Sequence, residues 1–251
     1  MLVQTDLFSE DSFDPLTTLT AVQRHFKDVK SFNDLDVMKF SGGYEPFRGS
    51  MVLASKMKQT FPFTNALNWM PALKKYILNK EYQFLDFETI IRAANRDGLG
   101  DGAFIRPVSG LKEFSGQVFT SVGKLENEFI FATKNRNISP YLICVAAPAQ
   151  AIFEEYRCVF IDGKYIDGAQ YLYSGQRTDR KIPNDCYIAD FARKIAEEAY
   201  FANVGNFIID LAETSSGLYL LEINAFETAS FYSCGLDKIY KAWANSLNEN
   251  F

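Results

Sequence analysis

The spacing of apolar residues changes along the chain, and these changes predict where helices and strands lie. After Asp14-Pro15, the residues Leu16, Leu19, Val22 and Phe26 recur at the three-to-four-residue spacing of a helix face. The same spacing predicts further helices over residues 69–80, 87–97, 187–203 and 236–247.

Shorter apolar runs predict strands over residues 103–108, 117–122, 141–147 and 156–173. The longest run contains Asp162-Gly163, a strong two-residue turn signal, and therefore predicts a hairpin. Residues 178–186 are predicted to form a loop. Strands followed by one long helix and a second hairpin are typical of an α+β fold. We expect a smaller N-terminal α/β region over residues 1–100, followed by a region that carries the chemistry over residues 101–251.

The second hairpin, residues 206–227, is the most informative segment of the sequence. Two apolar runs flank a Thr-Ser-Ser-Gly turn, and if the turn is centred on residues 215–216, Asp210 lies almost opposite Glu222. Asn224 shares the face of Glu222, because strand side chains alternate. Two carboxylates and an amide carbonyl suit Mg²⁺, which prefers oxygen ligands. The alternative is a hairpin with polar residues on its wet face.

Composition excludes several classes of chemistry. The chain has 251 residues, 47% hydrophobic and 23% charged, as in an ordinary globular protein. Its net charge of −5 gives no global attraction to nucleic acid or to an anionic membrane, although a local basic groove remains possible. Four widely spaced cysteines without a CxxC pair argue against a zinc knuckle and leave a reducing cytoplasm as the expected compartment. A single histidine, His25, argues against histidine-based catalysis.

A candidate phosphate-binding segment begins at Arg106, which lies at the end of a predicted strand. The loop that follows, residues 108–118, contains Ser109, Gly110 and Lys112. Small residues expose backbone N–H groups, and a lysine adds a mobile charge, so this loop can cover a polyphosphate. The Walker A pattern is absent. The alternative is an ordinary hairpin loop with a solvated lysine.

A second group of polar residues opens the next apolar strand. Glu155 and Arg157 point to one face, where they either form a structural ion pair or place Arg157 against phosphate oxygens. Gln170, Tyr171 and Arg177 are candidates for further polar contacts.

The order of these segments resembles the ATP-grasp superfamily, and more narrowly a compact clade of phage and bacterial ATP-grasp proteins. The matching segments are Arg48-Gly49-Ser50, FIRPVSGLKEFSGQVF (104–119), EYRCVFIDGKYIDGAQY (155–171) and FIIDLAETSSGLYLLEINAFETASFY (207–232). The resemblance runs from about Gly49 to the C-terminus. It implies a fold of two α+β subdomains that clasp ATP.

The resemblance also implies roles for individual residues. Asp210, Glu222 and Asn224 would bind Mg²⁺, and Arg106 would reach the nucleotide phosphates. A phosphate-covering loop would contain Ser109, Gly110 and Lys112. A hinge near residues 144–150 would contact adenine through the backbone of Val145 and Ala146, while Glu155, Arg157 and Gln170 would line the nucleotide and acyl-phosphate side. The chain departs from its relatives at the hinge, where Ala147 and Gln150 replace the usual Ser and Lys.

The activity implied by the resemblance is that of an ATP-dependent carboxylate–amine ligase. A substrate carboxylate would be phosphorylated with the help of Mg²⁺, and an amine would then displace phosphate to give an amide, with Arg106, Lys112 and Arg157 as catalytic residues. Two alternatives stay open: an ATP-binding protein without ligase activity, which the altered hinge favours, and an ATP-dependent phosphotransferase. The expected partners are small-molecule or peptide carboxylates and amines.

Overall fold

The computed structural model of this protein describes residues 1–4, 15–32, 46–111 and 113–249, which form two compact units. Unit 1 combines residues 1–61 with residues 152–251, and unit 2 consists of residues 62–151. The boundary expected after residue 100 lies inside unit 2, because elements on both sides of it share one sheet and one core. Both units mix helices and sheets, as expected for an α+β protein.

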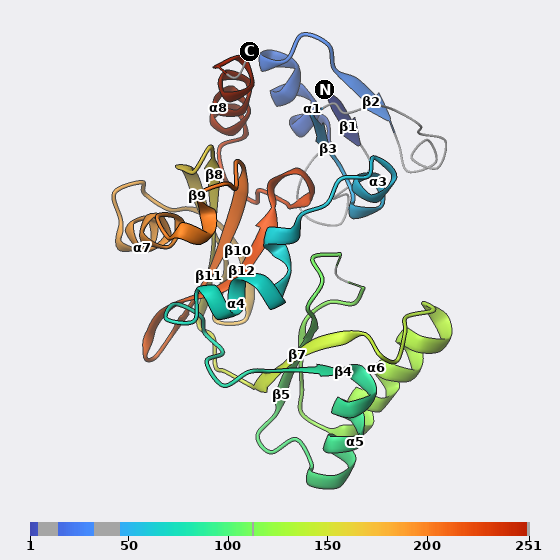
Figure 1. Ribbon diagram of the computed structural model, residues 1–251. Helices are drawn as coiled ribbons and strands as arrows, with labels where there is room; N and C mark the ends of the chain where they lie inside the picture. The colour runs from blue at the N-terminus through green and yellow to red at the C-terminus, as the bar shows by residue number, and fades with distance from the viewer. Residues whose placement is uncertain (5–14, 33–45, 112, 250–251) are drawn as a thin grey trace. The chain divides into compact units, whose positions relative to one another are not determined.

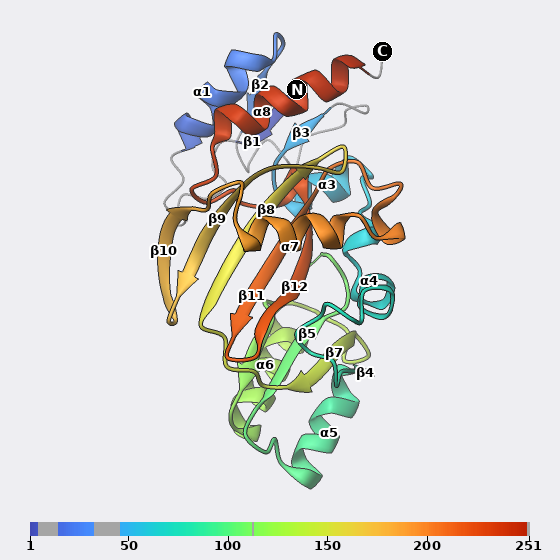
Figure 2. The same ribbon diagram turned by 90° about the vertical axis from the view of Figure 1, so that its left-hand side faces the viewer.

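Unit 1 is built on a five-stranded antiparallel sheet (Figure 2). In spatial order, its strands are β10 (Gln176–Lys181), β9 (Lys164–Tyr173), β8 (Glu154–Ile161), β11 (Phe207–Thr214) and β12 (Gly217–Ala225). The helix α7 (Tyr187–Ala196) and the short η2 (Ala199–Phe201) cover one face, where Phe160, Phe201 and Phe207 stack. We call this the α7 face and the opposite one the α8 face.

The α8 face of this sheet is apolar along only part of its length. Val159, Ile161 and Ile208 pack with Trp243 of α8 (Leu236–Glu249) in one buried core. The helix α1 (Pro15–His25) lies beside α8, as both Figure 1 and Figure 2 show. Further along β8 and β11 the same face becomes polar, beginning at Arg157 and Asp210.

A small parallel sheet completes unit 1. Its strand order is β2 (Lys30–Phe32), β1 (Leu2–Gln4) and β3 (Phe47–Arg48), followed by the helix α3 (Met51–Lys56). Leu2, Phe47 and Leu53 form its buried core.

Unit 2 contains a four-stranded antiparallel sheet with two helices on one face. Its strand order is β4 (Gln83–Asp86), β7 (Ile143–Pro148), β5 (Ala103–Pro107) and β6 (Gln117–Phe119), and its helices are α5 (Phe87–Asp97) and α6 (Val122–Asn135). Phe87, Ile105 and Leu125 share the core between them. The shorter η1 (Pro62–Thr64) and α4 (Ala66–Ala72) precede β4 in the chain.

The sequence prediction missed α6 and misplaced several boundaries. Helix α6 starts at Val122, inside the strand expected over 117–122, because the Ser121 hydroxyl caps it by accepting a hydrogen bond from the Lys124 N–H. Residues 176–181, partly expected as loop, form the edge strand β10 because they pair with β9. Helix α7 ends at Ala196 rather than at residue 203, since the backbone becomes extended at Glu198.

Two further helices also depart from expectation. The helix expected over 69–80 is shorter, ends at Ala72 and has Pro71 in its last turn. The apolar run after Arg48 is the helix α3 rather than a strand. In the part of the chain that the structure describes, no helix is long and apolar enough to cross a membrane.

Candidate functional site

The polar half of the α8 face brings together five of the residues singled out in the sequence. Glu155 and Arg157 lie on β8, Asp210 lies on β11, and Glu222 and Asn224 lie on β12. Cross-strand pairing sets Asp210 between Arg157 on one side and Glu222 on the other. Since directly paired residues point to the same face, the sheet gathers these side chains into one group, which we call the acid–arginine cluster.

A β-bulge decides the composition of this cluster. The hairpin turn has two central residues, with Thr214 paired to Gly217, so regular pairing from the turn would set Leu221 opposite Asp210. The register shifts by one between Asp210 and Leu211, and Glu222 takes that place instead. Without the shift, Glu222 would point to the α7 face.

Arg157 and Asp210 form a buried two-point ion pair at the centre of the cluster. Nε of Arg157 donates to Oδ1 of Asp210 at 2.8 Å, and Nη2 donates to Oδ2 at 2.6 Å. The amide of Asn224 donates to the same Oδ2 at 2.8 Å. Burial alone would lower the pKa of Arg157, but the Asp210 carboxylate outweighs it and raises that pKa, so Arg157 stays charged.

Two stacked tyrosines flank the Arg157 guanidinium. The rings of Tyr171 and Tyr232 lie 4.6 Å apart, and the guanidinium carbon is 4.7 Å from the Tyr232 centroid and 5.6 Å from that of Tyr171. Nη1 of Arg157 also donates to the Ser230 carbonyl at 2.6 Å. Ser230 and Tyr232 were not identified as site residues in the sequence, although both fall in the segment 207–232 that resembles the ATP-grasp superfamily.

Glu155 is the second carboxylate of the cluster whose ionisation the site alters. Its Oε2 accepts a hydrogen bond of 2.6 Å from the Tyr171 hydroxyl. Burial raises the pKa of Glu155, the Tyr171 hydrogen bond opposes that shift, and the nearby carboxylates of Asp210 and Glu222 add to it. A proton or a cation is therefore easier to hold here than at a solvated glutamate.

The donor atoms of the cluster fit a hard cation. Among the described residues, no group of three or more His, Cys, Asp or Glu is arranged to hold a metal ion. The candidate set is instead two carboxylates, Asp210 and Glu222, with the amide of Asn224. A carboxylate offers about four acceptor positions, so Asp210 keeps acceptor capacity beside its bonds to Arg157 and Asn224. Oxygen-only donors suit Mg²⁺ rather than zinc.

Gln170 does not join this cluster. It pairs with Tyr156, which lies on the α7 face, and its amide donates to Glu154. The Tyr156 hydroxyl also donates to Glu213 at 2.9 Å. The sequence placed Gln170 with Arg157 because a bulge in β9, which changes the parity of its residues, leaves no sequence signal.

In unit 2, Arg106 lies on the sheet face opposite the two helices. It pairs with Val145, while the neighbouring pair Ile105 and Ala146 faces the helix-covered core. The Arg106 side chain is 7% exposed, and its Nε donates to the Pro107 carbonyl at 3.1 Å. Of the two predicted adenine contacts, Val145 therefore shares the face of Arg106 and Ala146 does not.

The loop after β5 packs tightly against η1. A Cβ on Gly110 would lie 1.9 Å from the Thr64 Oγ1, so only glycine fits at this position without a shift of its neighbour. The Ser109 hydroxyl accepts a hydrogen bond of 2.9 Å from the Leu111 N–H. Lys112, predicted in this loop, lies outside the described residues.

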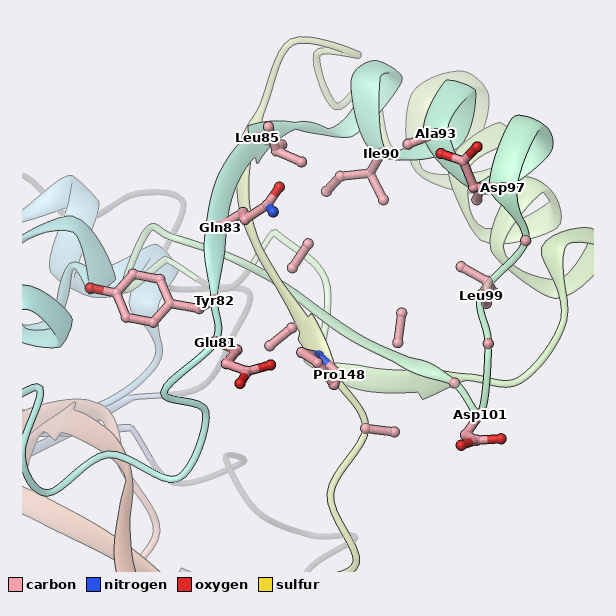
Figure 3. A pocket seen from close by; sticks show the side chains of 18 residues that line it. Glu81, Tyr82, Gln83, Leu85, Ile90, Ala93, Asp97, Leu99, Asp101 and Pro148 are labelled. Carbon is pink, nitrogen blue, oxygen red and sulfur yellow. The ribbon is translucent and has the colours of Figure 1, made fainter.

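A pocket of about 690 Å³ opens in unit 2 beside α5, the loop 98–102 and the end of β7. Leu85 and Ile90 point into it, whereas Asp101 points away (Figure 3). Its lining includes Ala146 and is mostly apolar. Because Leu85 and Ala146 also contact the helix-covered core, this pocket lies on the opposite side of the sheet from Arg106.

Arg48 has a buried position of its own in unit 1. It is 4% exposed, donates through Nη2 to the Ala229 carbonyl at 2.6 Å and through Nη1 to the Phe226 carbonyl, and lies 4.0 Å above the Phe231 ring. Arg48 therefore holds the loop that follows β12.

Comparison with known proteins identifies the family. The sequence profile of an ATP-grasp domain, family 3 of its clade, matches residues 22–244, most of the chain. The chain belongs to this ATP-grasp family. The predicted ATP-grasp fold is therefore confirmed, and ATP binding and ligase chemistry are properties of the superfamily to which this ATP-grasp protein belongs.

Solved structures with the same fold are ATP-grasp ligases. The D-cycloserine synthetase DcsG superposes with a TM-score of 0.64 at 14% identity, over 99% of this chain and 98% of that one. A RimK-domain ATP-grasp protein from Sphaerobacter thermophilus gives 0.60 at 12% identity, with 98% of each chain covered. D-alanine–D-alanine ligase from Bacillus anthracis gives 0.59 at 11% identity, over 99% and 95%. At these identities the likeness concerns the fold. No curated protein sequence matches this ATP-grasp protein.

Proposed function

We propose that this protein is an ATP-dependent carboxylate–amine ligase that works through an acyl-phosphate. The observation that carries the proposal is the acid–arginine cluster: two carboxylates, an amide and a buried arginine on one face of a sheet, in a chain of the ATP-grasp family. The near absence of histidine agrees with a reaction in which positioning and electrostatics, rather than a nucleophilic side chain, carry catalysis.

In this proposal Asp210, Glu222 and Asn224 hold Mg²⁺. When bound, the ion neutralises charge on the nucleotide phosphates. Asp210 is fixed for this task by Arg157 and Asn224, so it needs little reorganisation to bind a cation. Arg157 stays charged between Tyr171 and Tyr232, and we assign it to the phosphoryl group that is transferred, with Glu155 beside it.

Unit 2 supplies a second set of groups. We assign Arg106 to the nucleotide phosphates, Ser109, Gly110 and Lys112 to the covering loop, and the backbone around Val145 and Ala146 to the adenine. Gln170 is set apart from the cluster by its contact with Glu154, and its assignment to the nucleotide is the weakest of the set. The hinge near residues 144–150 stays a prediction, as does the effect of Ala147 and Gln150 on nucleotide affinity.

The chemistry proceeds in two steps. A carboxylate oxygen of the substrate attacks the γ-phosphorus of ATP, the bond to the β-phosphate oxygen breaks, and ADP leaves. An amine nitrogen then bonds to the acyl carbon, and the carbon–oxygen bond breaks to release inorganic phosphate and leave an amide. Arg106, Lys112 and Arg157 stabilise the charge that develops on the phosphoryl oxygens.

The substrate class follows from similar folds and is itself part of the proposal. D-cycloserine synthetase and D-alanine–D-alanine ligase point to amino-acid-like acids and amines, and the ligase PsnB, solved with a minimal precursor (TM-score 0.55, 11% identity), points to peptides. All four cysteines are free thiols, which suits a reducing compartment such as the cytoplasm of a bacterium or of a phage-infected cell.

The deciding experiment measures ADP release by the purified chain with Mg²⁺ and ATP, against a panel of amino acids and dipeptides as acids and amines. We expect release that requires both a carboxylate and an amine, and its loss in Glu222→Gln. Glu197→Gln is the matched control, since Glu197 is an exposed glutamate of unit 1 outside the cluster. Release with a hydroxyl acceptor alone would indicate a phosphotransferase. A Mg²⁺-dependent thermal shift with ATP but no release would indicate a binding protein.

A further inference from the structure

The loop after β12 carries an acidic residue that the mechanism above leaves without a task. Glu227 lies in the short turn η3 (Phe226–Thr228), three residues beyond Asn224. Arg48 donates to the carbonyls of Phe226 and Ala229, on either side of it, and the Gly49 N–H donates to the carbonyl of Glu227 at 3.1 Å. The backbone that presents Glu227 is therefore held from both sides.

The same loop is tied to the acid–arginine cluster. Nη1 of Arg157 donates to the Ser230 carbonyl at 2.6 Å, while its other nitrogens hold Asp210. Tyr232, two residues further on, stacks on Tyr171 and contacts the Arg157 guanidinium. Any group that reacts beside Asp210 is thus bordered by this loop.

The Glu227 carboxylate is partly withdrawn from water and has no side-chain partner. Within the described part of the chain, no other side chain forms a hydrogen bond or an ion pair with it. Arg48, the charged group that acts on it, has committed both Nη atoms to carbonyls. Burial raises the pKa of Glu227 to about 7, and its backbone hydrogen bond and the Arg48 charge oppose that shift only in part. A glutamate with a purely structural role would be paired, because withdrawing an unpaired carboxylate from water is costly.

We propose that Glu227 is the general base that accepts the proton of the attacking amine. This inference rests on the ligase function proposed above and assigns a residue to its second step. The amine nitrogen uses its lone pair to bond to the acyl carbon, and the acyl carbon–oxygen bond breaks, with its electrons leaving on phosphate. The proton that the nitrogen sheds moves to a carboxylate oxygen of Glu227 and later to water. A base whose pKa lies near the working pH is the most effective for such a transfer.

The test compares two nucleophiles in wild-type protein, Glu227→Gln and the control Glu197→Gln. Hydroxylamine is already deprotonated at neutral pH and traps the acyl-phosphate as a hydroxamate, whereas an ordinary amine must lose a proton. Glu227→Gln should lower amide formation at pH 7 by about 10²–10⁴-fold, the range for a lost general base, with little change in hydroxamate formation. Equal loss with both nucleophiles, or no loss with either, overturns the assignment.

A second measurement needs no substrate. Because the folded-state pKa lies above the value of about 4.3 for a free glutamate, the native state binds the extra proton between the two values. The stability of wild-type protein relative to Glu227→Gln should therefore fall as the pH rises from about 4.3 to 7, as followed by thermal unfolding. A flat difference overturns the proposal. If the difference is present but wild-type protein traps no acyl-phosphate with any acid, the ligase function itself has failed and Glu227 has no amine to serve.

Discussion

The carboxylate of Asp210 is held on both of its oxygens by the guanidinium of Arg157, at 2.8 and 2.6 Å, with the two side chains 2% and 7% exposed. The pair spans adjacent strands, β8 and β11, so it both fixes their relation and keeps a charged acid inside the sheet. The loop after β12 depends on the same arginine through Ser230. Folding and the candidate site therefore share these two residues.

Removing one member of this pair should destabilise the protein strongly. Arg157→Met leaves the Asp210 carboxylate buried without its cation, which we expect to cost about 3–5 kcal/mol in the free energy of unfolding measured with urea. The double variant Arg157→Met with Asp210→Leu should recover most of that loss, because no charge is left uncompensated. A single variant as stable as wild type would show that the pair does not form in solution.

Gly110 should tolerate no side chain. Its Cβ would overlap the Thr64 hydroxyl, so Gly110→Ala is expected to lower the free energy of unfolding by about 1–3 kcal/mol, and Thr64→Ala should restore part of it. Gly123→Ala is the matched control in the same unit. Nothing lies within 4 Å of the Cβ added at Gly123, in the first turn of α6, and that variant should be neutral or slightly more stable. Urea unfolding of the three variants decides the point.

The N-terminal cap of α5 should make stability depend on acid pH. The hydroxyl and N–H of Thr89 donate to Asp86 at 2.7 and 2.8 Å and hold the pKa of that carboxyl below its usual value. Its contribution is present above the unfolded pKa of about 3.9 and disappears as the pH falls through the lower folded value. Asp86→Ala should therefore be less stable at pH 7 and approach wild type in strong acid, whereas Asp86→Asn keeps most of the cap. Thermal unfolding from pH 2 to 7 measures the difference, and a constant gap would contradict it.

The four thiols should differ sharply in reactivity. Burial raises the pKa of Cys144 to about 12 and also raises those of Cys158 and Cys234, so these three should resist a thiol-specific chromogenic reagent. Cys186 is partly exposed and should react first. Cys186→Ser should remove the rapid phase, and unfolding in guanidinium should expose every thiol. A rapid phase that persists in Cys186→Ser would place another cysteine at the surface.

Arg106 should affect nucleotide binding more than folding. We expect Arg106→Ala to raise the KM for ATP, with a smaller effect for Arg106→Lys, which keeps the charge and loses the forked geometry. The magnesium-dependent thermal shift with ATP gives the same order without a substrate. An unchanged KM in Arg106→Ala would remove this residue from the phosphate site.

The sequence determined most of the local structure. The hairpins at Asp162-Gly163 and at residues 215–216 and the C-terminal helix follow from turn residues and apolar spacing, which act over a few residues. Helix α6 was missed even though Ser121 can cap it, because the apolar residues before and after that serine were read as a single strand. The family resemblance, carried by segments 104–119 and 207–232, supplied the fold.

Tertiary structure decided which side chains meet. A bulge in β12 brings Glu222 to the face of Asp210, and a bulge in β9 takes Gln170 away from Arg157; a one-residue shift of register reverses the direction of every later side chain and leaves no mark in composition. Ser230 and Arg48 acquired their roles through contacts over 73 and 181 residues of sequence separation. The sequence by itself determined the types of ligand and the family. Only the folded chain, in which strands and loops distant in sequence pack together, decided that Asp210 is paired with Arg157 and that the Glu227 carboxylate is left without a side-chain partner.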